Sequence, residues 1–103
     1  MHPIVESKRS ELLKVCRRLG VQRLELFGSA ARDDFDEARS DIDLLVEFDR
    51  TRPDARGLAP YFDLKEALED LFARNVDLVE IGTVRNPYVR FDIERDRLLL
   101  YAA

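Results

Sequence analysis

Two short polar segments of the chain carry residue types suited to chemistry on phosphates. The first runs from Gly28 and Ser29 to Arg32, directly after an apolar run. A glycine lets the backbone turn sharply and approach a ligand closely. A serine at a helix start offers a hydroxyl group beside unpaired N–H groups, and an arginine one turn later can bind two phosphate oxygens. This segment therefore predicts a phosphate-binding turn.

The second segment, Ser40-Asp41-Ile42-Asp43-Leu44, opens the next apolar run. Asp41 and Asp43 are two positions apart, so on a strand both carboxylates point to the same side. Two carboxylates at this spacing repel each other unless a cation lies between them. Mg²⁺ prefers oxygen ligands and needs only one or two carboxylates when water and phosphate oxygens complete its shell. Together the two segments predict metal-assisted phosphoryl or nucleotidyl transfer.

A third carboxylate, Asp77, lies between Val76 and Leu78 in a short apolar run. A carboxylate in such a run needs a partner, and a metal ion is one. We expect Asp77 to complete a two-metal site and to help activate an attacking hydroxyl group. Each feature also has an alternative interpretation without a ligand. Gly28 could form a simple turn, Asp41 and Asp43 could be solvated, and Asp77 could be an edge-strand carboxylate that faces water.

The elements that position these residues alternate between helix and strand. Apolar residues at helical spacing predict helices over residues 7–19 and 61–72, a helical turn at 30–32, and a further helix from Asn86-Pro87 to about residue 95. Alternation of apolar and polar residues predicts strands over 21–27, 41–48, 76–81 and 98–101. We expect an α/β fold, with a small mixed sheet of three to four strands flanked by helices, as one domain over residues 1–103.

Other residues are assigned to packing or to solvent. Gly20 is expected just past a helix end, and Cys16 is expected in the core. Residues 49–60 are predicted to form an exposed loop. Arginines in this part of the sequence are expected to keep the chain soluble, and four aromatic residues are expected to pack helices: Arg50, Arg52 and Arg56, then Tyr61, Phe62, Tyr88 and Phe91.

Composition excludes several classes of protein. The chain has 103 residues, of which 17 are basic and 21 acidic, so its net charge is -4. A dedicated nucleic-acid binder would need a basic face to follow phosphates. The apolar runs are too short for a membrane span or a signal peptide. A single cysteine suits a reducing compartment. We therefore expect a cytoplasmic protein that contacts neither nucleic acid nor membrane directly.

The combined motif resembles the DNA polymerase β-like nucleotidyltransferase superfamily. It consists of Gly28-Ser29-x-x-Arg32, eight further residues, Asp41-x-Asp43, and a lone aspartate in a later strand. The short length and the sequence Ser-Asp-Ile-Asp-Leu-Leu-Val resemble its minimal nucleotidyltransferase (MNT) branch, over nearly the whole chain. The resemblance implies the nucleotidyltransferase fold and Mg²⁺-dependent transfer from ATP, with two metal ions. It assigns residues as follows: Asp41, Asp43 and Asp77 to metal and catalysis, and Gly28, Ser29, Arg32 and Ser40 to the nucleotide.

The resemblance also implies a protein partner. MNT proteins of this size are commonly paired with a HEPN-domain ribonuclease toxin, against which they act as antitoxins. Some transfer AMP to a tyrosine hydroxyl group of the toxin, so a hetero-oligomer is expected. One alternative is an antitoxin that neutralises its partner by binding alone, with a vestigial nucleotide site. Another is transfer to a small molecule, for which related enzymes use a second, helical domain.

Overall fold

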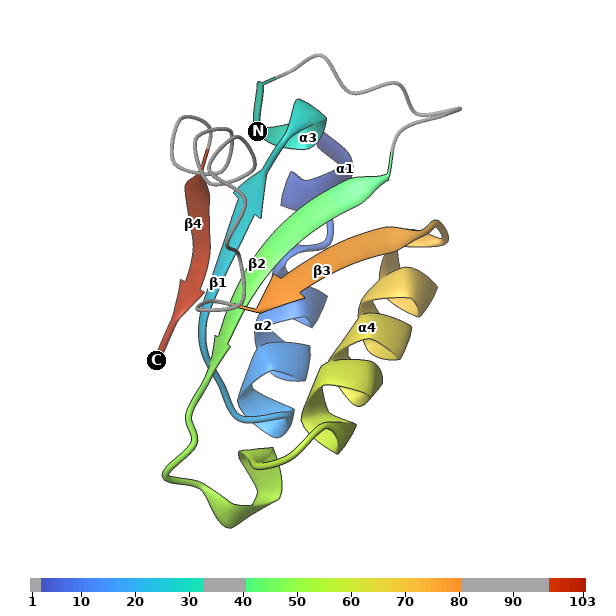
Figure 1. Ribbon diagram of the computed structural model, residues 1–103. Coiled ribbons are helices and arrows are strands. Elements are labelled where there is room, and N and C mark those ends of the chain that lie inside the picture. The colour runs from blue at the N-terminus through green and yellow to red at the C-terminus, as the bar shows by residue number, and fades with distance from the viewer. Residues whose placement is uncertain (1–2, 33–40, 81–96) are drawn as a thin grey trace.

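A computed structural model describes residues 3–32, 41–80 and 97–103. Its centre is a four-stranded mixed sheet in the order β3-β2-β1-β4 (Figure 1). The strands are β1 (Val21–Phe27), β2 (Ile42–Phe48), β3 (Val76–Glu80) and β4 (Leu98–Ala102). β1 is antiparallel to both β2 and β4, whereas β3 is parallel to β2. The predicted fold class and all four predicted strands are confirmed.

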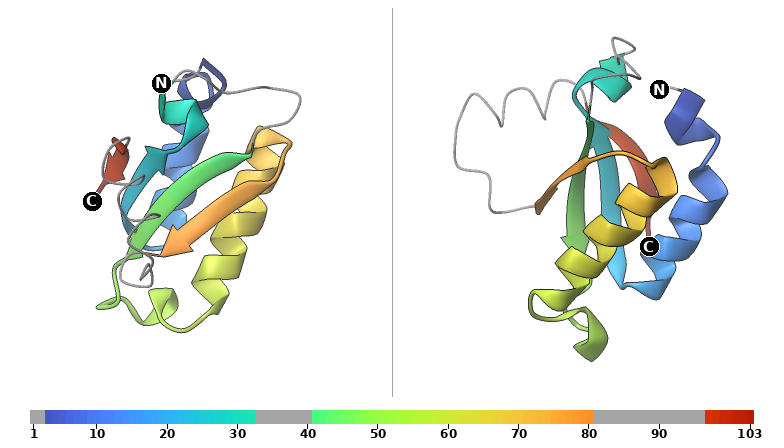
Figure 2. Two further views of the ribbon diagram at one scale, coloured as in Figure 1. Left: turned by 45° about the horizontal axis from the view of Figure 1, so that its top comes forward. Right: turned by 90° about the vertical axis from the view of Figure 1, so that its right-hand side faces the viewer.

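Helices cover one face of this sheet. They are α1 (Pro3–Glu6), α2 (Arg9–Arg18), α3 (Ser29–Arg32) and α4 (Ala59–Phe72), with a 3₁₀ turn, η1 (Pro53–Ala55), before α4. The long helices α2 and α4 lie side by side on that face, and α3 lies at the end where β1 finishes and β2 begins (Figures 1 and 2). The opposite face is free of these helices. The sheet therefore presents one apolar face to the helices and a second face that can carry polar groups.

The core forms between the helices and the sheet because both have apolar residues on the facing side. Leu12 of α2 and Leu64 of α4 are fully buried, as are inward-facing strand residues such as Leu24, Leu44 and Val46. Burial of one such side chain contributes about 1.5–3 kcal/mol. Cys16 also lies in this core, as predicted, and burial raises the pKa of its thiol to about 12. The core fixes β2 between β1 and β3, which sets the position of Asp43.

The helix boundaries differ from the prediction at two places. A short α1 precedes α2, and the sequence pattern did not indicate it. α4 begins at Ala59 because Pro60 occupies the first turn, where the missing N–H group costs no hydrogen bond. Gly20 follows the end of α2 with a φ of 74°, as expected for a residue past a helix end. The predicted helix from Asn86 lies outside the described residues.

The segment between β2 and α4 is more structured than the predicted exposed loop. Arg50 donates hydrogen bonds to the carbonyl oxygens of Ala55 (2.7 Å) and Gly57 (3.0 Å) and lies 5.0 Å from the ring centre of Phe48. Arg52 donates to the carbonyl of Arg17 at the end of α2 (3.2 Å), and Ala55 is fully buried. These arginines hold the connection in place rather than only keeping the chain soluble.

Two aromatic residues at the start of α4 have different environments. The hydroxyl group of Tyr61 donates to the carbonyl of Leu78 (2.7 Å), so this residue packs α4 against β3 as predicted. Phe62 is 59% exposed, so the prediction that it packs helices is wrong. Tyr88 and Phe91 lie outside the described residues. None of the helices in the described ranges is long and apolar enough to cross a membrane.

Candidate active site

Asp43 and Asp77 lie side by side on the sheet face that points away from α2 and α4. They are register partners in the parallel pair formed by β2 and β3. Their neighbours Leu44 and Leu78 are buried in the core, so alternation along each strand turns both carboxylates to the other face. Adjacent strands lie about 4.8 Å apart. Asp43 is half-buried and Asp77 is exposed, so ligands from solvent can reach the pair.

The turn after β1 brings Gly28 against Asp43. Phe27 is the last residue of β1 and pairs with Asp43 across the antiparallel ladder. Gly28 then has a φ of 71°, and a Cβ atom at this position would overlap the Asp43 carboxylate, with its Cγ at 3.1 Å. Glycine alone fits both the backbone angle and the space. The predicted phosphate-binding turn and the predicted carboxylate therefore meet at one end of the sheet.

The remaining predicted site residues are placed as follows. Ser29 opens α3 and is half-buried, directly after the Gly28 turn. Asp41 is exposed and precedes β2 by one residue, where the N–H group of Ile42 donates to the carbonyl of Asn75 (3.3 Å). The backbone of Arg32 ends α3, whereas the Arg32 side chain and the whole of Ser40 lie outside the described residues.

The predicted chemistry requires these carboxylates to bind a divalent metal ion. Within the described ranges, no three side chains of His, Cys, Asp or Glu converge closely enough to hold a metal ion. Asp41 therefore does not join Asp43 and Asp77 in a three-carboxylate cage. Two adjacent carboxylates still match a Mg²⁺ site, because this ion keeps several waters and takes its other ligands from phosphate oxygens. The donor set fits a metal that arrives with a nucleotide.

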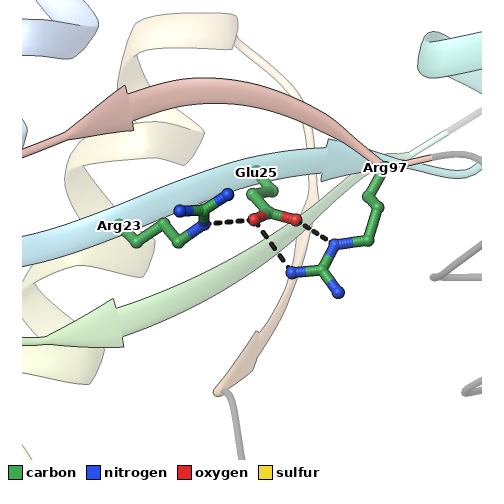
Figure 3. Close-up of polar contacts among 3 residues, drawn as sticks. All are labelled: Arg23, Glu25 and Arg97. Carbon is green, nitrogen blue, oxygen red and sulfur yellow. Dashed lines mark hydrogen bonds and ion pairs between the residues drawn. The ribbon is translucent and has the colours of Figure 1, made fainter.

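The same sheet face carries a buried carboxylate that sequence reasoning missed. Glu25 of β1 is 2% exposed and is paired with Arg23 and Arg97 (Figure 3). Nη2 of Arg97 donates to Oε1 of Glu25 at 2.9 Å. The hydrogen bond from Arg97 holds the pKa of Glu25 below its ordinary value of 4.5, and Arg23 acts in the same direction. The contact joins the start of β4 to the central strand.

Alternation along β1 puts Glu25 and Arg23 on the same side of the strand, opposite the core residues Leu24 and Leu26. Arg23 is two positions away, which is a local signal for the pair, but Arg97 is 72 positions away and gave none. Nearby, Phe27 and Leu45 are buried in a second, smaller apolar cluster with Val79 packed on it. The face opposite the helices therefore has an acidic pair at one end, an apolar patch, and an arginine-bound glutamate.

Comparison with known proteins shows the family to which this chain belongs. The family model for the nucleotidyltransferase domain matches residues 9–100, so the chain belongs to this family of enzymes. Two proteins of Methanocaldococcus jannaschii, each named "Putative protein adenylyltransferase", are 42% and 38% identical to the chain. Each match covers 86% of this chain and 84% of the relative.

Solved structures place the chain in the minimal branch of the family. A structure described as a "putative minimal nucleotidyltransferase" is 35% identical, with a TM-score of 0.73 over 91% of this chain and 90% of the other. Two complexes share the fold at lower identity. A toxin–antitoxin complex with AMP-PNP has a TM-score of 0.68, at 21% identity over 92% of this chain and 73% of the other. A complex of a tri-AMPylated Shewanella oneidensis HEPN toxin with an MNT antitoxin has a TM-score of 0.64, at 19% identity over 95% and 72%.

Proposed function

We propose that the chain transfers AMP from ATP to a tyrosine hydroxyl group of a HEPN ribonuclease toxin and so acts as its antitoxin. The observation that carries the proposal is the register pairing of Asp43 with Asp77 beside the Gly28 turn. Family membership and the two Methanocaldococcus relatives support the adenylyl transfer. The shared fold of the two toxin–antitoxin complexes supports the choice of partner.

Each residue has a role set by its position. Asp43 and Asp77 would hold Mg²⁺, which when bound neutralises the carboxylate pair and polarises the phosphate oxygens of ATP. Ser29 would donate hydrogen bonds to the nucleotide phosphates, because it directly follows Gly28, which lies against Asp43. We keep Arg32 and Ser40 as proposed phosphate contacts. Asp41, exposed at the start of β2, is proposed as a further ligand that joins when the nucleotide is bound.

The proposed reaction is a displacement at the α-phosphorus atom of ATP. The acceptor oxygen forms a new bond to this phosphorus, and the bond from phosphorus to the bridging oxygen of the β-phosphate breaks. Pyrophosphate leaves with the bonding electron pair. The hydroxyl proton passes to a carboxylate, and Asp77 is suited to accept it because its side chain is exposed on the reacting face.

The acceptor is proposed to be a protein because two relatives are named protein adenylyltransferases and one structure that shares the fold contains an AMPylated toxin. A hetero-oligomer with the toxin in the cytoplasm would bring the hydroxyl group to the sheet face that carries the aspartate pair. The alternative, an antitoxin that acts by binding alone, predicts that this pair is dispensable for protection. The two functions therefore differ in a property that can be measured.

The test uses the protein encoded by the adjacent gene as acceptor. We expect incubation with ATP and Mg²⁺ to add the mass of AMP to one of its tyrosines, as read by mass spectrometry of peptides. Asp43→Asn should abolish the added mass, while Glu11→Gln, an exposed carboxylate on α2, should not change it. An unmodified acceptor, or equal modification by Asp43→Asn, refutes the enzymatic proposal. Full protection of cells by Asp43→Asn would instead support neutralisation by binding.

A further inference from the structure

Two large apolar side chains stand exposed at the start of α4. Leu58 is 74% exposed and Phe62 is 59% exposed. They lie one helical turn apart, and the N–H group of Phe62 donates to the carbonyl of Leu58 (3.3 Å). The ring of Tyr61 supports Phe62 edge-on, with 5.2 Å between ring centres. Adjacent exposed apolar side chains of this size mark a site of interaction more often than isolated ones do.

A groove of about 360 Å³ lies between α2 and α4, and its lining residue Glu66 is one helical turn after Phe62. Its charged lining consists of Asp63, Glu66 and Asp70 of α4 and Arg18 of α2, three carboxylates and one guanidinium, so its net charge is negative. The groove follows successive turns of α4 from the position next to Phe62. A ligand that covers the apolar pair and also enters the groove would gain from positive charge.

The connection before α4 holds this surface in a defined shape. The carbonyl of Gly57, the residue before Leu58, accepts a hydrogen bond from Arg50 (3.0 Å), and the same guanidinium binds the carbonyl of Ala55 (2.7 Å). Arg56 donates in turn to the carbonyl of Arg50 (2.9 Å). A surface fixed before binding loses less conformational entropy when a partner docks.

We infer that this α4 surface, formed by Leu58, Phe62, Asp63, Glu66 and Asp70, binds a basic amphipathic helix of the protein partner. An apolar side chain of that helix would cover Leu58 and Phe62, and its lysine or arginine side chains would enter the groove. The negative charge disfavours nucleic acid and anionic membranes as ligands. A ribonuclease must itself carry basic surface to bind RNA, which complements this charge. The inference rests on the proposed function for the existence of a protein partner and for that partner being a ribonuclease.

The α4 surface and the aspartate pair lie on opposite sides of the sheet, because Asp43 and Asp77 are on the face that points away from α4 (Figure 1). The start of α4 and η1 are at one end of the sheet, whereas α3 and the start of β2 are at the opposite end (Figures 1 and 2). A partner held on α4 leaves Asp43 and Asp77 accessible, so a different segment of that partner must bring the acceptor hydroxyl group to the opposite face of the sheet. Binding and transfer are consequently separate properties that different substitutions should remove.

The test measures the dissociation constant between this chain and the purified product of the adjacent gene by titration calorimetry. The double variant Leu58→Ser, Phe62→Ser should raise Kd at least about tenfold, the size typical of losing central apolar anchors. The matched control is Leu99→Ser, which removes another exposed apolar side chain (47%) on β4 and should leave Kd unchanged. Raising the salt concentration should weaken binding of the wild-type chain. Thermal unfolding confirms that each variant is folded.

Three outcomes would overturn the inference. The first is equal binding by the double variant and the wild-type chain. The second is self-association of the wild-type chain in sedimentation that the double variant loses, which would make a second copy the occupant. The third is no binding of the adjacent gene's product to the wild-type chain, which also removes the partner from the proposed function. Intact binding without AMP transfer would refute the proposed enzymatic function alone.

Discussion

Gly28 lies against the carboxylate of Asp43, so closely that a Cβ atom at residue 28 would come within 3.1 Å of Asp43 Cγ. The backbone of Gly28 is also in the left-handed region, with a φ of 71°. The turn that brings the predicted phosphate-binding segment to this carboxylate thus has no space for a methyl group at residue 28. This relationship yields a substitution whose effects on stability and on activity should differ.

Gly28→Ala should abolish AMP transfer while costing little stability. The new methyl group meets the far end of the Asp43 side chain, which can rotate away, so the carboxylate is lost from its position rather than the fold. The unfavourable φ alone costs about 1 kcal/mol. Urea unfolding and the transfer assay measure the two effects.

Gly57→Ala is the matched control. Gly57 has a φ of 78°, but a Cβ atom there meets nothing within 4 Å. It should therefore lose a similar amount of stability and keep full transfer activity. Equal transfer by the two variants would show that the contact between Gly28 and Asp43 has no role in the site.

The acidic pair should be a source of instability that Mg²⁺ and nucleotide relieve. Asp43 and Asp77 are like charges at paired positions on neighbouring strands, so Asp77→Asn should leave the melting temperature of the metal-free chain unchanged or raise it. Adding Mg²⁺ and a non-hydrolysable ATP analogue should raise the melting temperature of the wild-type chain and not that of Asp43→Asn. A lower melting temperature for metal-free Asp77→Asn would show that the two carboxylates do not repel each other appreciably.

Glu25 should make the fold sensitive to acid. Its pKa is lowered in the folded protein, first by the hydrogen bond from Arg97. A depressed pKa gives stability that is present above the unfolded value near 4.5 and is lost as the pH falls through the folded value. Glu25→Gln should cost about 1–3 kcal/mol at neutral pH and show a weaker loss of stability below pH 4.5. Denaturant titrations at several pH values measure this, and identical pH profiles would exclude the effect.

Arg50 should stabilise the connection between β2 and α4. Its side chain binds two carbonyl oxygens and lies over the Phe48 ring. Arg50→Ala should therefore cost about 1–2 kcal/mol and expose the segment to limited proteolysis. Arg56→Ala, which removes one hydrogen bond on the surface, should cost less. An equal effect of the two substitutions would mean that Arg50 does not organise the segment.

Local pattern was sufficient to predict the strands and the residues of the acidic pair. The alternation of Ile42, Leu44 and Val46 with Asp43 predicts that this segment is a strand. It also predicts that the Asp43 carboxylate lies on the face opposite the apolar side chains. The motif also placed Gly28 near this strand's start, but the close contact between Gly28 and Asp43 needed three-dimensional packing. Side-chain roles for Arg32 and Ser40 remain predictions.

Features that depend on distant residues could not be predicted. Glu25 looked solvent-facing because Arg97, which allows its burial, lies far along the chain. The arginines after β2 were predicted only to keep the chain soluble. Their hydrogen-bond acceptors are backbone carbonyl groups, which no sequence pattern reveals. The aromatic residue Phe62 is expected from the sequence to pack helices, but α4 turns it outward, where it forms part of the α4 surface.

The central claim is that the pair Asp43 and Asp77 supports transfer of a nucleotidyl group rather than a phosphate. One measurement tests it directly: the adjacent gene's product is incubated with this chain, Mg²⁺ and ATP labelled at either the α- or the γ-phosphate. We expect label on the acceptor from α-labelled ATP alone, release of labelled pyrophosphate from γ-labelled ATP, and no transfer with Asp43→Asn or Asp77→Asn. Label from γ-labelled ATP on the acceptor, or transfer that persists in both variants, would contradict it.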